Sequence, residues 1–232
     1  EKIIQEVEKY YPFDLYESEN IIAKTFQRWL KAPLYKYDDE EVNQLLDDLQ
    51  NTLAIEYDDL QKEAIRLFLE QSAMILTGGP GTGKTTIVEA IIKLYTKLNP
   101  DQRIAMVAPT GRASKRLSEV TGLEACTIHR LLKWDLHTNT FAVNAQNPLD
   151  IDLLVIDEFS MVDSLLFSNL LSASCKVTKI LLIIMLVLYV ALLIMRYKKK
   201  DNPKIEGGVQ VVQGILWSFI AVDSWAERSI GM

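Results

Sequence analysis

Residues 73–86 read AMILTGGPGTGKTT, a short apolar run followed by a glycine-rich stretch. The apolar run predicts a buried strand, and the amphipathic pattern from Thr86 to about Lys97 predicts a helix. Glycine adopts backbone conformations closed to other residues and lets the chain approach a bound group closely. Successive N–H groups at the start of a helix then form a concave site for an anion. The stretch therefore predicts a strand, a phosphate-binding loop and a helix.

The segment from Gly78 to Thr85 contains the complete P-loop pattern, a glycine, four residues and then Gly-Lys-Thr. In this pattern Lys84 supplies a positive charge for the β- and γ-phosphates, and the Thr85 hydroxyl reaches Mg²⁺. The alternative is a glycine-rich turn that only connects a strand to a helix. The flanking elements favour nucleotide binding, with contacts from Gly79, Pro80, Gly81, Thr82, Gly83, Lys84, Thr85 and Thr86.

The composition is typical of a folded protein from a reducing compartment. The 232 residues suffice for one large domain or two small ones, each with a buried core. Cys126 and Cys175 are too few for a disulfide framework, so we expect a cytoplasmic location. The first residue is Glu1 and not Met, which leads us to expect a fragment of a longer protein.

The net charge of −6 is distributed unevenly. Residues 1–72 hold 17 of the 31 acidic and 8 of the 25 basic side chains, so the rest of the chain is weakly positive. An acidic total does not predict a nucleic-acid-binding protein. Arg112, Lys115 and Arg116 nevertheless lie close together, either as a local basic patch or as an ordinary solvated helix face.

The first 70 residues are predicted to be helical and peripheral. Apolar residues recur there at helical spacing, and Pro12 and Pro33 separate the segments. We expect a small helical segment over residues 1–55, followed by a second unit over residues 56–175. In that unit strands and helices alternate, with apolar runs at 104–108 and 153–156 after the first strand.

This alternation is typical of an α/β fold, a parallel sheet with helices on both faces. Further helices are expected at about 112–120 and 128–133, and a hairpin around Thr138 and Asn139. Ligands of such sheets bind at the carboxyl ends of the strands. The P-loop, residues 109–111 and residues 157–158 all follow predicted strands, so we expect them to meet at one edge.

Asp157 and Glu158 directly follow the third apolar run. A carboxylate at the end of a buried strand beside a P-loop would hold Mg²⁺, as the Walker B aspartate does. Glu158 is placed to orient and deprotonate an attacking water, which would make the reaction a hydrolysis. The alternative is an acidic pair that caps a helix. The P-loop favours a catalytic role for Lys84, Asp157 and Glu158.

Five segments stand in order along the chain, at residues 57–65, 78–86, 108–114, 127–132 and 157–161. Together they resemble the first motor domain of RecD-like helicases, a group of superfamily 1. Such a resemblance implies the RecA-like fold of P-loop NTPases and translocation from 5′ to 3′ on single-stranded DNA. It covers about residues 10–172, and five motifs in register are far more specific than one.

The resemblance implies roles for individual residues. Gln61 matches the glutamine that reads the adenine edge, so ATP is the implied nucleotide, with Mg²⁺ held by Thr85 and Asp157. A lone histidine such as His129 is more often packed than functional, but the motif reverses that preference, whereas His137 is expected in a loop. The residues that match strand-contacting motifs, and so imply single-stranded and duplex DNA as partners, are Pro109, Thr110, Gly111, Arg112, Thr127 and His129.

The resemblance stops shortly after the third strand. The family's next motif is a strand ending in Gly-Asp, then a Gln-Leu-Pro loop, and residues 175–177 would begin that strand. Neither that motif nor a second motor domain with its arginine finger follows before Met232. Because an arginine finger raises hydrolysis by orders of magnitude, we expect this chain alone to hydrolyse ATP very poorly.

Residues 176–232 form an atypical hydrophobic tail in this interpretation. Residues 180–195 carry no charged side chain and Arg196 to Lys200 are basic. As a helix the run would span roughly 24 Å, short of the roughly 30 Å hydrocarbon core. A shifted reading frame is favoured over a genuine membrane segment. A buried strand and helix would require partners that we do not expect in this chain.

Three functional hypotheses follow. The favoured one is an N-terminal fragment of a RecD-like ATP-dependent DNA helicase, with other recombination or repair proteins as partners. The second is a module that binds ATP without turnover, and the third is a P-loop protein anchored in a membrane through residues 180–195.

Overall fold

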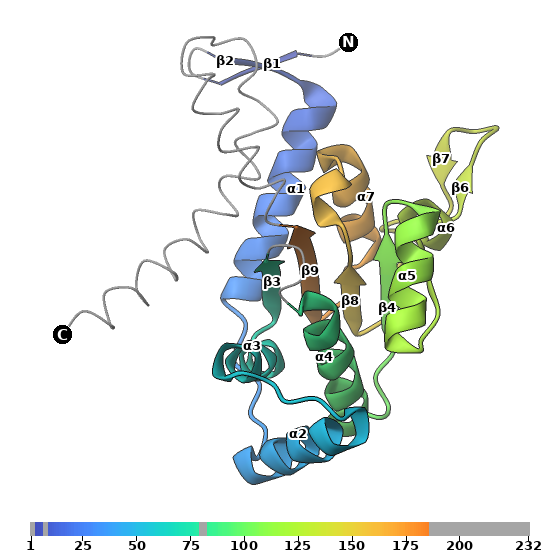
Figure 1. Ribbon diagram of the computed structural model, residues 1–232. Coiled ribbons are helices and arrows are strands. Elements are labelled where there is room, and N and C mark those ends of the chain that lie inside the picture. The colour runs from blue at the N-terminus through green and yellow to red at the C-terminus, as the bar shows by residue number, and fades with distance from the viewer. Residues whose placement is uncertain (1–2, 7–8, 79–82, 186–232) are drawn as a thin grey trace, which may run out of the picture.

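A computed structural model describes residues 3–6, 9–78 and 83–185 of the chain. Its centre is a five-stranded sheet in which every pairing is parallel (Figure 1). The predicted α/β fold is therefore confirmed. The strands, in spatial order, are β3 (Ala73–Gly78), β9 (Lys179–Met185), β8 (Leu153–Ile156), β4 (Ile104–Ala108) and β5 (Ala125–Thr127).

Helices cover both faces of this sheet (Figure 1). One face packs against α2 (Asp39–Leu53), α3 (Asp59–Glu70), α4 (Lys84–Leu98) and α5 (Gly111–Thr121). The other face packs against α1 (Phe13–Leu30), α6 (Ile128–Leu131) and α7 (Ser164–Ala173). Successive side chains of a strand point to opposite faces of the sheet. Alternate strand residues therefore pack into the hydrophobic core on one face and the core on the other.

Side chains at the helix starts fix where these helices begin. Asp38, Asp58, Thr110 and Asp163 each accept a hydrogen bond from a backbone N–H in the first turn of the helix that follows. These bonds satisfy donors that a helix leaves without an internal partner, and each is worth about 1 kcal/mol. The α5 helix ends at Thr121 and is followed by Gly122, whose φ of 72° suits a glycine.

The strand β9 corrects two expectations about residues 175–195. It lies in the middle of the sheet, with Ile180 opposite Ala73 of β3 and Ile156 of β8 opposite Leu182. The expectation that a buried strand here lacks partners in this chain was wrong, because β3 and β8 are those partners. The strand also begins at Lys179 and not at residues 175–177. Residues 186–195 of the apolar run lie outside the described residues.

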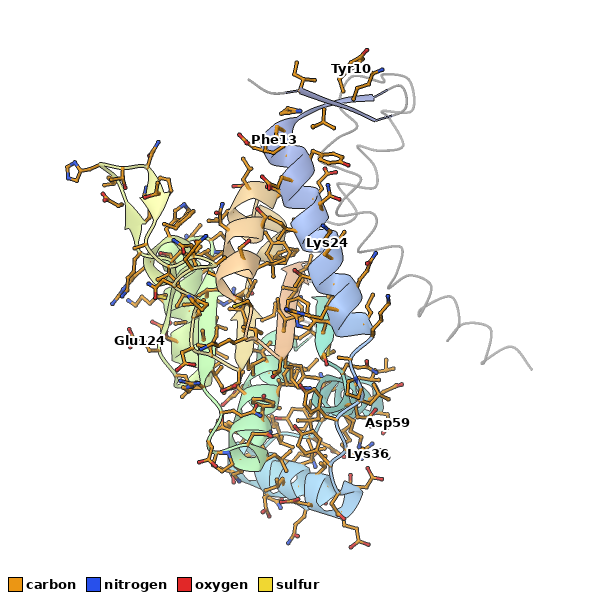
Figure 2. The ribbon with its side chains drawn as sticks, turned by 180° about the vertical axis from the view of Figure 1, so that it is seen from behind. Tyr10, Phe13, Lys24, Lys36, Asp59 and Glu124 are labelled. Atoms are coloured by element: carbon orange, nitrogen blue, oxygen red, sulfur yellow. The ribbon has the colours of Figure 1, made fainter. Side chains whose placement is uncertain are left out.

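The N-terminal segment differs from the predicted peripheral helices. Residues Ile3–Glu6 and Lys9–Pro12 form the antiparallel strands β1 and β2, and Tyr10, labelled in Figure 2, is exposed. β-Branched and aromatic residues there favour extended backbone. The expectation that the segment is peripheral was wrong for α1. Phe26 and Trp29 of that helix are buried in the same core as α7 and the sheet.

The segment between α6 and β8 carries a small hairpin. Strands β6 (Trp134–Asp135) and β7 (Thr140–Phe141) pair antiparallel, which confirms the hairpin predicted around Thr138 and Asn139. Asn139 has a positive φ of 56°, which asparagine tolerates in a turn. His137 is exposed in the connecting loop, as expected.

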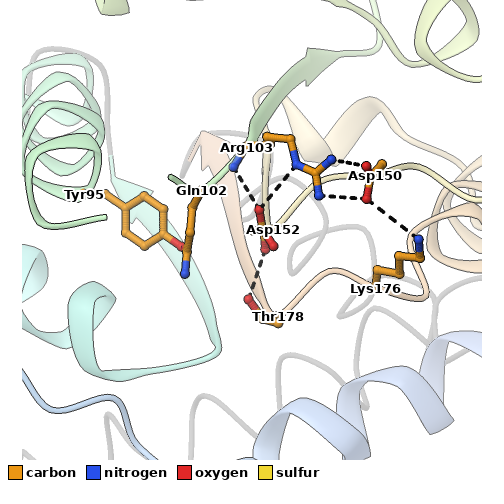
Figure 3. Close-up of polar contacts among 7 residues, drawn as sticks. All are labelled: Tyr95, Gln102, Arg103, Asp150, Asp152, Lys176 and Thr178. Atoms are coloured by element: carbon orange, nitrogen blue, oxygen red, sulfur yellow. Dashed lines mark hydrogen bonds and ion pairs between the residues drawn. The ribbon is translucent and has the colours of Figure 1, made fainter. Parts of the chain in front are cut away.

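A polar network joins the amino ends of β4, β8 and β9 (Figure 3). The Arg103 guanidinium binds both carboxylate oxygens of Asp150, and Lys176 lies 3.7 Å from the same carboxylate. Arg103 and Lys176 hold the pKa of Asp150 below its usual range. Exposed ion pairs add little stability. The Asp152 N–H donates to the Arg103 carbonyl at 2.8 Å, and the Asp152 carboxylate accepts from the Arg103 N–H at 2.9 Å. Together with the bond from the Thr178 N–H to the Asp152 carbonyl at 3.0 Å, these contacts fix this edge.

Among the residues that the structure describes, no helix is both long and apolar enough to cross a bilayer.

Tyr57 provides a test of this packing. Its side chain is buried, its hydroxyl has no hydrogen-bond partner in the described structure, and burial raises its pKa to about 12. An unsatisfied buried hydroxyl costs free energy. We expect Tyr57→Phe to leave the free energy of unfolding unchanged or raise it by about 1 kcal/mol, measured by urea denaturation.

The matched control is Tyr95→Phe. The Tyr95 ring is equally buried, but its hydroxyl donates to the Gln102 side chain (Figure 3). This variant should lose about 1 kcal/mol. Equal destabilisation by both variants would show that the Tyr57 hydroxyl is bonded in solution.

Candidate active site

The sheet brings the predicted polar segments to one edge. Because all its strands are parallel, their carboxyl ends lie together, and crevices at this edge bind ligands in such folds. The loop after β3, the turn after β4 and the Asp157-Glu158 pair after β8 all leave the sheet there. Four of the predicted nucleotide contacts, Gly79, Pro80, Gly81 and Thr82, lie outside the described residues.

Gly83 forms the end of the P-loop and the N-cap of α4. Its φ is 75°, in the left-handed region that favours glycine. A Cβ on this residue would lie 2.8 Å from Nε2 of Gln61. A side chain at this position would collide with Gln61, so the glycine allows the Gln61 carboxamide to lie directly against the end of the P-loop.

Lys84 begins α4, and its Nζ donates to the Gly78 carbonyl at the end of β3. The side chain therefore folds back across the loop. Burial lowers its pKa, the charge of Arg116 lowers it further, and the carboxylate of Asp157 acts in the opposite direction. A phosphate bound here would supply the negative charge that an ammonium in this position favours. Thr85 is exposed beside it and Thr86 is half-buried.

Asp157 lies at the end of β8, and its N–H donates to the Val107 carbonyl of β4 at 2.9 Å. Burial raises the pKa of its carboxyl group, while the Glu158 N–H, Arg116 and Lys84 lower it. The Glu158 N–H donates to Asp157 Oδ1 at 2.8 Å. Asp157 and Lys84 thus influence one another electrostatically across the site.

These oxygen donors fit Mg²⁺. The ion prefers oxygen ligands and is typically bound through one or two carboxylates together with substrate phosphates. The Asp157 carboxylate and the exposed Thr85 hydroxyl are groups of this kind. Across residues 3–6, 9–78 and 83–185, no group of three His, Cys, Asp or Glu side chains could hold a metal by itself. In a site of this kind, waters and nucleotide phosphate oxygens would supply the remaining ligands.

Glu158 has an unusual backbone. Its φ and ψ of 49° and 38° are left-handed, and it precedes the 3-10 helix η1 (Phe159–Met161). A non-glycine residue in this region costs roughly 1–3 kcal/mol and is found often at active sites. No side chain caps η1, so the alternative of a helix-capping acid pair is not supported. The left-handed turn is a feature that the sequence did not reveal.

Gln61 lies beside the P-loop, at the start of α3. It forms a capping box with Asp58: the Gln61 N–H donates to Asp58 Oδ1 at 2.8 Å, and Gln61 Oε1 accepts from the Asp58 N–H at 3.2 Å. The amide nitrogen Nε2 faces Gly83. The structure thus brings Gln61 to the nucleotide loop, while its contact with adenine stays a prediction.

The predicted strand-contacting residues surround two helix starts. Pro109 and Thr110 directly follow β4. Thr110 Oγ1 accepts a hydrogen bond from the Ala113 N–H at 3.2 Å, and Gly111 and Arg112 are exposed. Phosphate groups bind readily at helix N-termini, where N–H groups lack internal partners. Thr110 serves as a cap in the structure, and its predicted contact with DNA stays a prediction.

Thr127 and His129 occupy the second helix start. Thr127 Oγ1 accepts from the Arg130 N–H at 3.2 Å. His129 is exposed, and its ring lies 6.1 Å from Trp134 and 5.9 Å from Phe141, measured between centroids. It is therefore not a core histidine, and it adjoins two rings of the β6–β7 hairpin.

Arg116 is a residue whose charge acts on the site and to which sequence reasoning gave no role. The sequence placed it only in a basic cluster with Arg112, four residues earlier on the same face of α5. In the fold its charge acts on both Lys84 and Asp157. The spacing of four residues predicts that Arg112 and Arg116 lie on one face of the helix. The packing of α5 beside α4, which brings Arg116 toward the site, could not be predicted from that spacing.

Comparisons with known proteins show which family this chain is similar to. Residues 61–184 match a protein family described as an AAA domain, and the match extends into β9. The RecBCD enzyme subunit RecD of Buchnera aphidicola (subsp. Schizaphis graminum) is 34% identical over 196 residues, which cover 76% of this chain and 32% of that protein. The RecD subunit of Mycolicibacterium smegmatis is 37% identical over 145 residues, covering 53% and 26%.

A third relative is the ATP-dependent RecD2 DNA helicase of Deinococcus radiodurans. It is 42% identical over 110 residues, which cover 47% of this chain and 15% of that protein. The chain thus spans about a third or less of the length of these curated relatives. The resemblance to RecD-like helicases that the motifs predicted is confirmed.

Gly83→Ala tests the P-loop geometry. The methyl group would meet Gln61 Nε2, and alanine would be strained at a φ of 75°. We expect the affinity for a fluorescent ATP analogue to fall at least about tenfold, because the clash must displace either the Gln61 carboxamide or the backbone at the end of the P-loop.

The control is Gly122→Ala. Gly122 has almost the same φ, 72°, but nothing lies within 4 Å of an added Cβ. This variant should lose stability and keep its affinity for the analogue. Equal affinity losses in both variants would mean that strain alone, and not the contact with Gln61, explains the effect.

Proposed function

Because this chain belongs to the AAA domain family, we propose that it binds ATP with Mg²⁺ as the first motor lobe of a RecD-like ATP-dependent DNA helicase. One observation carries the proposal. Lys84, Asp157 and the Gln61–Gly83 contact lie at the same carboxyl edge of one parallel sheet. These residues supply a phosphate-binding cation, a carboxylate and an amide beside the loop.

The residues divide the chemistry among them. Lys84 and the first N–H groups of α4 would bind the phosphates. Asp157 and Thr85 would hold Mg²⁺, which when bound neutralises charge on the phosphate oxygens. Glu158, adjacent to Asp157 and held in a left-handed turn, would orient the attacking water and accept its proton. The reaction supported is therefore ATP hydrolysis.

DNA is the proposed second ligand. The residues Pro109 to Arg112, together with Thr127 and His129, lie at the ends of β4 and β5, beside the nucleotide edge. Hydroxyl and N–H groups at these positions suit phosphate oxygens, and exposed rings suit bases. We further propose 5′ to 3′ translocation, a role in recombination or repair with other proteins, and a cytoplasmic location consistent with the free thiols of Cys126 and Cys175.

A nucleotide-binding module without turnover is the second candidate. The described residues contain one parallel sheet, which would provide one side of an ATP site. Helicase-type sites gain orders of magnitude in rate from an arginine supplied across the nucleotide. Arg116 approaches from the same lobe as Lys84 and is not such a group.

Lys84→Ala tests nucleotide binding in the full chain. Loss of the ammonium should weaken binding of the fluorescent ATP analogue by at least about tenfold, as expected for a charge-assisted phosphate contact. Lys93→Ala is the control, since Lys93 lies on the same helix and pairs with Glu89 at 2.6 Å. If Lys84→Ala binds the analogue as tightly as the wild type does, the P-loop assignment fails.

Glu158→Gln separates hydrolysis from binding. The amide cannot accept a proton from water, so turnover should fall by about 10²-fold or more while ATP affinity is kept. The measurement is phosphate release with and without single-stranded DNA. DNA-stimulated release by the wild-type chain that disappears in Glu158→Gln supports the helicase lobe. ATP binding without release supports the module.

A further inference from the structure

Lys179 is the first residue of β9, and its side chain is fully buried. Its ammonium group donates three hydrogen bonds to backbone carbonyls at the end of α3. They run to Phe68 and Leu69, both at 2.8 Å, and to Gln71 at 2.5 Å. The same nitrogen lies 4.2 Å from the centroid of the Tyr35 ring. All three N–H donors of the ammonium group are therefore hydrogen-bonded.

These bonds complete the C-terminus of α3. The last four carbonyls of a helix have no partner inside it. In α3 the Leu67 carbonyl accepts from the Gln71 N–H, and the Glu70 carbonyl accepts from the Tyr35 N–H at 2.8 Å. Lys179 satisfies the remaining two, Phe68 and Leu69. A positive charge at the C-terminus of a helix also interacts favourably with the helix dipole.

The buried position of Lys179 disfavours the charged form of its side chain. Burial lowers its pKa to about 7, and the carboxylate of Glu70 acts in the opposite direction. A buried ammonium persists only where hydrogen bonds replace its water. Three carbonyls and the faces of two aromatic rings, Tyr35 and Phe68, provide that replacement. An apolar residue would suit this buried strand better, so the lysine points to a role beyond filling space.

The other end of α3 lies at the nucleotide loop. The helix runs for 12 residues, so its two ends are about 18 Å apart. Its first turn carries Gln61, whose Nε2 is 2.8 Å from the position of a Cβ on Gly83. β9 covers a similar length along the sheet, roughly 20 Å from Lys179 to Met185, and Met185 pairs with Gly78 at the start of the P-loop. Lys179 of β9 therefore contacts one end of α3, while the other end of α3 and the far end of β9 both lie beside residues of the P-loop region.

We propose that Lys179 is a positioning residue of the nucleotide site: by binding the C-terminal carbonyls of α3 from the central strand, it holds the Gln61 carboxamide against the P-loop. This inference rests on the proposed ATP binding. It assigns Lys179 an effect on recognition of the adenosine part of ATP, transmitted through α3, and no direct contact with the nucleotide. A purely structural lysine would affect the whole site equally.

The experiment compares two ligands on the full chain. Lys179→Met keeps the length and removes the ammonium, and its binding of ATP and of inorganic tripolyphosphate is measured by calorimetry. We expect ATP affinity to fall about fivefold, the size of one lost interaction with a helix terminus, and tripolyphosphate affinity to change less than about twofold. Lys176→Met is the control, because Lys176 is exposed and pairs with Asp150; neither affinity should change.

A double-mutant cycle identifies the route. If Lys179 acts through Gln61, Lys179→Met should have no further effect on ATP affinity in a Gln61→Ala background. Additive losses, or equal losses of ATP and tripolyphosphate affinity, overturn the proposal. Wild-type affinity of Lys179→Met for ATP overturns it as well. A wild-type chain that binds neither ligand refutes the proposed function itself, which is a distinguishable result.

Tyr35 provides a second variant if Lys179→Met does not fold. Tyr35→Leu removes the ring beside the ammonium and leaves the three carbonyl bonds, so a partial loss of ATP affinity is expected with tripolyphosphate binding kept. Tyr35→Phe retains the ring and removes only the hydroxyl, which donates to the Thr178 carbonyl at 3.4 Å, and should bind ATP as the wild type does. Equal ATP affinity in the two Tyr35 variants contradicts the proposal.

Discussion

The central strand β9 is the element on which the rest of this structure depends. A strand buried on both faces must be apolar, and it must find hydrogen-bond partners along both edges. Ile180 and Leu182 face the core of α1 and α7, while Leu181 and Ile183 face the core of α3 and α4. One intervening strand keeps β3 and β8 about 10 Å apart. That spacing sets the separation of the loops that carry Lys84 and Asp157.

The charges at the carboxyl edge are arranged for a ligand. Burial works against the ionised forms of both Lys84 and Asp157, and the two groups stabilise each other only in part. Arg116 favours the Asp157 carboxylate but opposes the Lys84 ammonium. A phosphate group and a divalent cation would give each residue the opposite charge that it lacks. The fold thus fixes these charges before the nucleotide arrives, as electrostatic preorganisation requires.

The sequence predicted features whose cause is local, and it failed where distant segments meet. The P-loop, the strand before Asp157 and the hairpin at Asn139 follow from nearby residues, because glycine, apolar runs and turn residues act over a few positions. The place of β9 was missed, because an apolar run suits a membrane segment and a buried strand equally. The capping role of Thr110 and the approach of Arg116 to the site depend on packing between helices.

The order of the strands gives the N-terminal segment and β9 a joint role. β3 pairs only with β9 within the described sheet, so the strand that carries the P-loop joins the other strands through residues 179–185 alone. The approach to β9 is held in turn by α1, whose Trp29 donates to the Val177 carbonyl at 3.3 Å. That contact joins residues 148 positions apart, so closing the chain between them costs conformational entropy that packing must offset. The strand that carries the P-loop thus depends on Lys179 and the rest of β9 for its hydrogen-bonded neighbour in the described sheet.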